Sequence, residues 1–340
     1  MSIHRPFSTS AATEEVLVSL TPEDAGWEWT GLRVVRLSPG RPVRLETGPS
    51  EVFVLPLRGS LGVEVSHVDR AGSTEAKFDL DGRGSVFSAV TDFAYVGRDS
   101  VVTLLSDRVA EVALPAARCA TRLEARYGAA ADVPVETRGA GSASRQVNNF
   151  GVPGVWDHAE KLVCCELITP PGNWSSYPPH KHDASEPCEV VNEEIYYYRI
   201  AGSDQVTPSD EGFGYHRTYT GPEHLAAGLA PIDETLEVRD HDVVVVPHGY
   251  HGPCMAAPGY PMYYLNAMAG PADERAMAFC DDPAHAWLRG SWDDQPIDPR
   301  CPVTSADGRA DGLVPSYDTE HSKDVDHPHT GHSKDVEDAR

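Results

Sequence analysis

Three histidines and one glutamate in the second half of the 340-residue chain have the spacing of a metal site carried by β-strands. His180 and His182 stand two residues apart, and side chains at this spacing on a strand point to the same face. Glu194 opens the run Ile-Tyr-Tyr-Tyr, and His251 follows a run of four valines, so both are expected at strand ends. Three neutral imidazoles and one carboxylate suit zinc, manganese or iron, and they leave coordination positions open for a substrate.

The elements that must position these residues are short β-strands. Apolar runs alternate with turns rich in the 29 glycines and 28 prolines, for example at 32–37, 52–57, 61–65, 195–200, 242–246 and 262–268. Evenly spaced short strands of this kind predict a β-sandwich or a β-barrel. The one helix that we expect in the first half covers residues 116–127, where Ala, Arg, Leu and Glu are frequent. The predicted fold class is therefore all-β with few short helices.

Length and strand order predict two domains and a tail. A chain of 340 residues suits two domains of ordinary size, and a loose segment at 128–144 separates the two series of strands. The first domain holds only His4 and His67, with no His-x-His pair before Glu51, so we expect no metal site there. The tail is polar, and disorder explains it better than metal binding by its four histidines. We predict domains at 1–138 and 139–301 and a disordered tail at 302–340.

The acidic composition and the cysteine usage restrict the partners and the compartment. A formal charge of -24 repels nucleic acid and anionic membranes, so neither is expected as a partner. No run reaches the length of a membrane span, and the first 20 residues lack the apolar core of a signal peptide. The seven cysteines are odd in number and form no Cys-x-x-Cys motif, so a disulfide framework is not expected. We expect a cytoplasmic protein with reduced thiols.

The order of these motifs resembles the cupin superfamily, in which a glycine and a His-x-His pair precede a glutamate, a Pro-Gly turn, a third histidine and an asparagine. The matching residues here are Gly172, His180, His182, Glu194, Pro247, Gly249, His251 and Asn266. The interval from His182 to Glu194 is longer than is usual for cupins, so Glu189 and Glu193 compete as the ligand. Glu194 is preferred because it directly precedes the Ile-Tyr-Tyr-Tyr strand.

Longer motifs are similar to one cupin family, the 5-deoxy-glucuronate isomerases of inositol catabolism, or IolB proteins. They lie at 172–183, 193–200, 212–214, 247–251, 258–270 and 281–287. The resemblance extends more weakly through the first half. It implies a bicupin of two tandem β-barrels. Because the first half lacks a comparable set of histidines, we interpret the N-terminal cupin as a structural partner that has lost its metal ligands. The 5-keto-4-deoxyuronate isomerases of pectin breakdown are related to this family.

The reaction implied by this resemblance converts 5-deoxy-D-glucuronate to 2-deoxy-5-keto-D-gluconate by moving hydrogen between C1 and C2. A divalent ion, zinc or manganese, would act as a Lewis acid on the carbonyl oxygen and the adjacent hydroxyl. A base must also move a proton. Tyr196 and Tyr198 alternate onto the face of Glu194, and Tyr264 shares a face with Asn266, although barrel filling explains each tyrosine as well. His248 is an equal candidate for base, ligand partner or turn residue.

The carboxylate of a uronate needs a cation, and arginine has the best geometry for it. We expect Arg217 to bind it, with Lys181 second and Asn266 as a further substrate contact. Arg199 alternates away from Glu194 and is expected to face outward.

Three alternative functions remain open at this point. The pectin-type isomerase is a near neighbour, an iron-dependent cupin dioxygenase uses the same four ligands, and a sugar-sensing or storage cupin would bind a ligand without turnover. The expected partner is a small uronate. Because cupin barrels associate through their sheets, a homo-oligomer is also expected.

Overall fold

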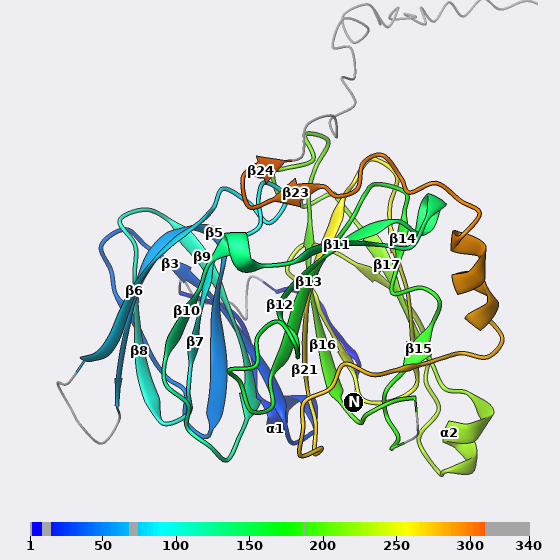
Figure 1. Ribbon diagram of the computed structural model, residues 1–340, viewed down its shortest axis with the longest axis horizontal. Coiled ribbons are helices and arrows are strands. Elements are labelled where there is room, and N and C mark those ends of the chain that lie inside the picture. The colour runs from blue at the N-terminus through cyan, green and yellow to red at the C-terminus, as the bar shows by residue number, and fades with distance from the viewer. Residues whose placement is uncertain (1, 9–14, 68–73, 186–187, 310–340) are drawn as a thin grey trace, which may run out of the picture.

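The computed structural model describes residues 2–8, 15–67, 74–185 and 188–309, and it consists of two β-rich halves side by side (Figure 1). The strands of the first half join in one nine-stranded arrangement with the path β10-β7-β5-β9-β3-β2 and with β4, β6 and β8 attached. Their bounds are β2 (Val16–Leu20), β3 (Thr30–Leu37), β4 (Val43–Glu46), β5 (Ser50–His67), β6 (Thr74–Arg83), β7 (Phe93–Val96), β8 (Ser100–Leu105), β9 (Ala110–Arg118) and β10 (Arg126–Gly128).

The second half is built from two sheets. A seven-stranded sheet runs β1-β19-β16-β21-β13-β12-β11, and its strands are β1 (His4–Arg5), β11 (Val135–Arg138), β12 (Arg145–Gly151), β13 (Val163–Thr169), β16 (Glu193–Ile200), β19 (Val243–Val246) and β21 (Met262–Ala269). A six-stranded sheet runs β18-β17-β20-β15-β22 with β14 beside β20, and its strands are β14 (Trp174–Ser175), β15 (His180–Lys181), β17 (Gly214–Tyr219), β18 (Asp233–Val238), β20 (Tyr250–Ala256) and β22 (Cys280–Asp281).

Helices are few and short, as expected for this all-β fold. The α-helices are α1 (Pro22–Ala25) and α2 (Pro222–Ala226), and the 3-10 helices are η1 (Ala130–Asp132), η2 (Gly141–Ala143) and η3 (Ala286–Trp292). None of these described helices is long and apolar enough to cross a membrane.

The helix predicted at 116–127 is wrong. Residues up to Arg118 belong to β9, which lies between β3 and β5 and pairs with both strands, and the chain then turns into β10. The alanines there have a high helix propensity, but pairing on two sides satisfies the backbone of β9 in the extended form. Tertiary pairing therefore overrides the local preference.

The buried hydrophobic residues form two clusters, of which one lies within the first half and the other spans both halves. The cluster that spans both halves includes Phe53 and Phe93 of the first half together with Tyr197 and Tyr264 of the second. At its edge, Arg83 of β6 forms a fully buried ion pair with Glu166 of β13. Arg199 faces away from Glu194, as expected, but it is buried and pairs with Glu111 of the first half at 2.9 Å. The halves are joined by apolar packing and by buried charge pairs.

Glu51 begins the long strand β5 much as Glu194 begins β16, but it has a structural role. Its carboxylate accepts hydrogen bonds from the backbone N–H groups of Glu160, Lys161 and Leu162 at 2.6–2.8 Å. His4 lies 2.9 Å from Asp242, and His67 lies 3.3 Å from Glu75. These contacts account for the carboxylate and for both histidines without a metal.

Residues 302–309, which the sequence assigned to the polar tail, form a hairpin of β23 (Thr304–Ser305) and β24 (Gly308–Arg309). The side chain of Gln146 holds this hairpin by accepting hydrogen bonds from the N–H groups of Val303 and Thr304. The rest of the predicted tail, with its four histidines, lies outside the described residues.

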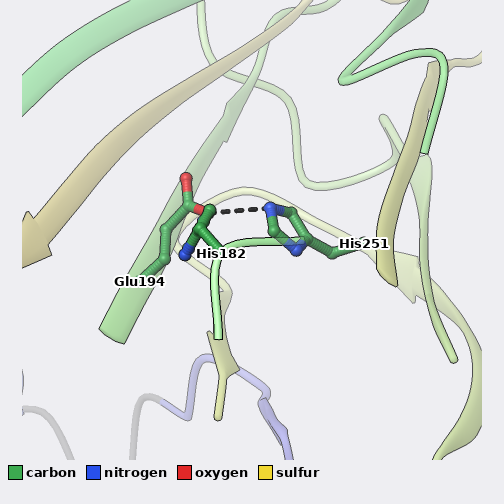
Figure 2. Close-up of side chains that lie close together, drawn as sticks. All are labelled: His182, Glu194 and His251. Atoms are coloured by element: carbon green, nitrogen blue, oxygen red, sulfur yellow. Dashed lines mark hydrogen bonds and ion pairs between the residues drawn. The ribbon is translucent and has the colours of Figure 1, made fainter. Parts of the chain in front are cut away.

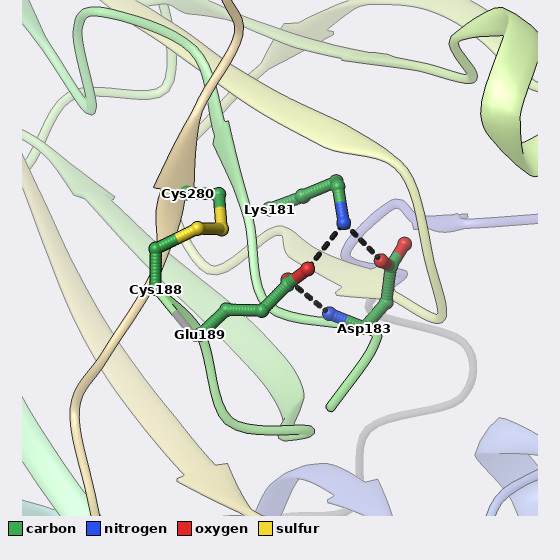
Figure 3. Close-up of a disulfide and its surroundings, with 5 residues drawn as sticks. All are labelled: Lys181, Asp183, Cys188, Glu189 and Cys280. Atoms are coloured by element: carbon green, nitrogen blue, oxygen red, sulfur yellow. Dashed lines mark hydrogen bonds and ion pairs between the residues drawn. A yellow bond between two sulfur atoms is a disulfide. The ribbon is translucent and has the colours of Figure 1, made fainter. Parts of the chain in front are cut away.

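One disulfide links two segments of the second half. Cys188 and Cys280 are bonded across 92 positions of sequence, with their Cα atoms 5.3 Å apart (Figure 3). The expectation of reduced thiols throughout is therefore wrong for this pair. The pairing of β15 with β22 places Cys280 opposite Lys181, and a hydrogen bond from the N–H of Val190 to the carbonyl of Ala278 brings the segment of Cys188 alongside. Sequence spacing alone carries no sign of that contact.

Candidate metal centre

The side chains of His182, Glu194 and His251 converge inside the second barrel (Figure 2). Glu194 comes from β16 in one sheet, His251 comes from β20 in the other, and His182 directly follows β15. Their ligand atoms all lie within 4.8 Å of one another. Glu194 Oε2 is 2.9 Å from His182 Nε2 and 3.0 Å from His251 Nε2. This is the arrangement expected of a buried site for one cation.

His180 lies beside this group but outside the set of three. Its ring centroid is 4.5 Å from that of His251 and 6.5 Å from that of His182, and β15 pairs with β20 at the positions of His180 and His251. The structure thus places the four predicted ligands together, three of them at the separation of a shared ion.

The hydrogen bonds of the imidazoles fit a metal. In each histidine, Nδ1 faces a backbone carbonyl: that of Pro178 for His180, Asn192 for His182 and Gly249 for His251. An N–H at Nδ1 that donates to a carbonyl leaves the lone pair of Nε2 free to bind a cation. Nε2 of His251 is buried and has no hydrogen-bond partner, because its 3.0 Å contact with Glu194 lacks hydrogen-bond geometry. A bound cation would satisfy this orphaned atom.

The charges of the cluster are mutually dependent. Burial disfavours the ionised form of Glu194, but the nearby His251 and His182 and the hydrogen bond from His182 outweigh burial and hold its pKa well below the usual range. Burial likewise disfavours protonated His182, yet the hydrogen bond to Glu194 and the charge of Glu194 raise its pKa. For His180, burial and the nearby His251 lower the pKa, so this imidazole is neutral.

The three competing glutamates have different partners. Glu189 accepts hydrogen bonds from the Lys181 ammonium and from the N–H of Asp183 (Figure 3). Glu193 accepts hydrogen bonds from the backbone N–H groups of residues 28–30 at 2.7–2.9 Å. Of the three, Glu194 is the one that belongs to the histidine cluster. Adjacent residues on a strand point to opposite faces, which separates Glu193 from Glu194.

A cavity of about 40 Å³ adjoins the cluster. Its lining includes His180, His182, Glu194, Tyr196, Asn266, Ser176, Arg138, Arg145 and Arg289, together with mostly apolar residues. Asn266 donates a hydrogen bond to Glu194 Oε1 from the neighbouring strand β21. The hydroxyl of Tyr196 lies 2.9 Å from Ser176 Oγ, and the hydroxyl of Tyr264 donates to the same Oγ at 3.5 Å. Three hydroxyls therefore meet beside the cluster.

Ser176 and the three arginines were missed by sequence reasoning. Ser176 has a φ of 46°, which is uncommon for a residue with a side chain, and it adjoins Tyr177 in the turn before His180. The arginines come from β11, β12 and η3, and nothing in their local sequence connects them with the histidines.

Four predicted site residues neither line the cavity nor belong to the metal cluster or to the three hydroxyls beside it. Strand alternation turns His216 and Thr218 inward, so Arg217 faces outward and pairs with the exposed Asp233 at 2.5 Å. Lys181 alternates away from His180 and His182 and pairs with Glu189 and Asp183. The remaining two are His248, which contacts the carbonyl oxygen of Ala230, and Tyr198, which contacts His216 Nδ1 at 2.6 Å.

The fold and the site together define a bicupin with a candidate metal centre in its second barrel. The chain belongs to the KduI/IolB family, since the model of that family matches residues 3–288. A protein named 5-deoxy-glucuronate isomerase from Geobacillus thermodenitrificans is 38% identical over 286 residues, which cover 84% of this chain and 95% of that protein. Its namesake from Bacillus subtilis strain 168 is 32% identical over 289 residues, which cover 84% and 97%.

Solved structures agree with this assignment. A crystal structure of an IolB-like protein from Salmonella typhimurium has a TM-score of 0.72 at 29% identity, covering 85% of this chain and 99% of that one. Oxalate decarboxylase from Lactobacillus farciminis has a TM-score of 0.53 at 11% identity, covering 82% and 85%. At that identity the likeness is one of fold, and it supports the cupin architecture predicted from the sequence.

Proposed function

We propose that this protein is an aldose–ketose isomerase that converts 5-deoxy-D-glucuronate to 2-deoxy-5-keto-D-gluconate in inositol catabolism. The observation that carries the proposal is the buried His182, Glu194 and His251 cluster, in a chain 38% identical to a protein named 5-deoxy-glucuronate isomerase. The cavity beside this cluster is lined by hydroxyl, amide and guanidinium groups, which suits a small polar acid.

His180, His182, Glu194 and His251 would hold one divalent ion, and zinc or manganese suits this set of ligands. When bound, such an ion polarises a substrate carbonyl. The protein's own contribution is positional. Asn266 holds the carboxylate of Glu194, and the backbone carbonyls of residues 178, 192 and 249 fix the ring orientation of the three histidines.

The hydroxyls of Tyr196, Ser176 and Tyr264 are our candidates for donating hydrogen bonds to the substrate oxygens at C1 and C2 during the isomerisation. Burial raises the pKa of Tyr196 far above its usual value, with the negative charge of Glu194 next in importance, so its hydroxyl is neutral. A neutral phenol can donate a hydrogen bond to the oxygen that becomes negative in an enediol-like transition state. Tyr264 is included because its hydroxyl donates to Ser176, which lines the cavity. Tyr198 and His248 neither line the cavity nor bond to Ser176, since they contact His216 and Ala230.

Proton NMR of the purified protein with 5-deoxy-D-glucuronate tests the proposal. We expect the signals of the aldehyde, its hydrate and its hemiacetal to disappear as those of the keto acid grow. A chelator should stop the conversion, and added metal should restore it. A folded, metal-loaded protein that leaves the substrate unchanged would disprove the proposal. The same sample would then be tried with 5-keto-4-deoxyuronate and with an oxygen electrode, which detect the pectin-type isomerase and the dioxygenase.

We also propose that the protein is cytoplasmic and forms a homo-oligomer through its sheets. The acidic composition, with a formal charge of -24, disfavours anionic membranes and nucleic acid as alternative partners. Cell fractionation tests the compartment, and size-exclusion chromatography with light scattering tests the oligomer. A monomer at micromolar concentration would contradict the second statement.

A further inference from the structure

The cavity beside the metal cluster has a cationic side made of three arginines, two of which have a carboxylate partner. Arg138 forms two hydrogen bonds with Glu136, at 3.0 and 2.8 Å. Arg289 forms two with Asp281, one of them at 2.7 Å. These two guanidinium groups are therefore neutralised by neighbouring acids, and they are not available for a second bidentate partner.

Arg145 is different. Its side chain is buried, with 4% of the residue exposed, and its Nε has no hydrogen-bond partner. Nη1 donates to the carbonyl of Ala143 at 3.1 Å and Nη2 to the carbonyl of Tyr177 at 3.4 Å. Among the described residues, no carboxylate lies within ion-pair distance of it. The Trp292 ring, 5.4 Å from the guanidinium carbon, covers one face of the group.

A buried guanidinium without an anion is costly, because desolvation of the charge is not offset by a partner. Burial lowers the pKa of Arg145 to about 10, and the nearby Arg138 and Arg289 contribute in the same direction. The group nevertheless remains a cation at neutral pH. An anion that enters the cavity would remove this penalty by forming charge-assisted hydrogen bonds.

The place of Arg145 in the sheet sets where such an anion would lie. Arg145 begins β12, opposite Arg138 on β11, and the order β12-β13-β21-β16 leads across the sheet to Glu194. Three strand spacings amount to about 14 Å between backbones. Arg145 lines the same cavity as His180, His182 and Glu194, so one small ligand there can contact both sides.

We propose that Arg145 binds the carboxylate of the substrate and thereby places the opposite, aldehyde end of the sugar acid against the histidine–glutamate cluster. The identity of that sugar acid rests on the proposed function, whereas the carboxylate site does not. Arg145 then makes the cavity specific for sugar acids over neutral sugars. A neutral sugar of the same shape leaves the guanidinium unpaired, so the cavity discriminates against it.

The test compares a carboxylate with its uncharged isostere. Isothermal titration calorimetry with sodium D-glucuronate and with D-glucuronamide is carried out on the wild-type protein, on Arg145→Gln and on Arg145→Lys. We expect the wild type to bind the acid roughly 10- to 100-fold more tightly than the amide. Arg145→Gln should lose this preference while its affinity for the amide stays the same, and Arg145→Lys should retain part of the preference.

Arg44→Gln is the matched control, because it removes the same charge from an exposed arginine on β4 of the first half. It should bind both probes as the wild type does. Thermal melts verify that each variant is folded. If Arg145→Gln does not fold, the comparison of acid and amide is made with Arg145→Lys alone. Three outcomes would overturn the proposal: no preference for the acid in the wild type, an unchanged preference in a folded Arg145 variant, or an equal loss for acid and amide.

Turnover separates this inference from the proposed function. If the wild type prefers the acid through Arg145 but leaves 5-deoxy-D-glucuronate unchanged, the isomerase assignment fails and the carboxylate site stands. If the wild type isomerises that substrate and a folded Arg145→Gln variant keeps its KM, Arg145 does not bind the carboxylate.

Discussion

Glu194 shows how strongly the role of a residue depends on the face to which it points. Its neighbour Glu193 and the nearby Glu189 have the same side chain but different partners. Glu193 accepts hydrogen bonds from backbone N–H groups, and Glu189 pairs with Lys181. Glu194 alone of the three faces His182 and His251. The different roles of these three glutamates predict different effects of Glu→Gln substitutions on metal binding.

Glu194→Gln should lose most of its bound metal, because an amide supplies no negative charge to the ion. We expect a loss of affinity greater than the roughly 10- to 100-fold that follows removal of an outer partner. Glu189→Gln and Glu193→Gln are the controls, and both should retain metal as measured by elemental analysis of the dialysed protein. If Glu193→Gln or Glu189→Gln is the variant that loses metal, our assignment of the ligand is wrong.

Tyr196→Phe should lower kcat by roughly 10²-fold, because the neutral phenol that donates to the transition state is removed. KM and metal content should change little. Tyr197→Phe is the matched control, since Tyr197 alternates to the other face and its hydroxyl contacts His241. Steady-state kinetics with the NMR assay measures both variants, and an unchanged kcat in Tyr196→Phe would exclude this hydroxyl from stabilising the transition state.

His241 should make the free energy of unfolding depend on pH. Burial and the adjacent Arg199 lower its pKa from 6.5 to about 4. Between these values the unfolded chain binds a proton at this residue and the folded chain does not. The stabilisation by neutral His241 is therefore complete above pH 6.5 and is lost as the pH falls toward 4. The total is roughly 3 kcal/mol.

Urea unfolding at several pH values between 4.5 and 7.5, with a chelator present, measures this dependence. His241→Asn should show a shallower decrease on acidification than the wild type, and asparagine tolerates the positive φ of 68° at this position. Identical pH profiles for the two proteins would show that His241 titrates normally in the folded state.

At the scale of elements, the strand that carries His251 packs closely against the turn that carries Ser176. Gly252 of β20 has a φ of +90°, and a side chain at this position would overlap the carbonyl oxygen of Ser176. This contact sets the depth at which β20 presents His251 to the cluster. The packing of strand β20 against the Ser176 turn therefore controls the position of His251 in the metal cluster.

Gly252→Ala should destabilise the protein and weaken metal binding, because either β20 or the Ser176 turn must move. Gly259→Ala is a close control, since Gly259 has the same φ of +90° and nothing lies within 4 Å of an added methyl group. Both variants bear a backbone cost of about 1–3 kcal/mol. The additional loss of stability and of metal in Gly252→Ala measures the contact. Equal losses in the two variants would mean that the contact is unimportant.

At the scale of the molecule, the shared core predicts that the two halves unfold together. The Arg83–Glu166 pair lies between them with a complete set of partners. Arg83 Nε donates to the carbonyl of Pro56, and Glu166 also accepts hydrogen bonds from Asn148 and Tyr263. Such a network is costly to break, because removing one partner leaves the other charge buried.

Arg83→Met should lower the free energy of unfolding by about 3–5 kcal/mol, because it leaves Glu166 buried without its cation. Lys77→Met is the control on the same strand, since the Lys77–Glu64 pair is exposed and contributes little. Urea unfolding followed by fluorescence and circular dichroism should show one transition for every variant. Two separate transitions would show that the halves are independent folding units.

The division into domains at 1–138 and 139–301 remains a proposal. Two strands from residues 1–138 pair with strands of the second half. β1 comes from the first residues of the chain but pairs with β19, and β11 precedes the proposed boundary but pairs with β12. A fragment of residues 139–301 alone would expose the edges that these strands cover.

The sequence by itself determined the strand-rich fold and the local part of the site. Alternation along β16 and the His-x-His spacing are local properties, so they placed Glu194, His180 and His182 on inward faces, and the family motifs identified the cupin architecture. The cavity arginines, the Cys188–Cys280 disulfide and the strand at 116–118 were decided only by the tertiary structure. Each depends on which strands become neighbours, because counter-ions, covalent partners and backbone pairing come from segments distant in sequence.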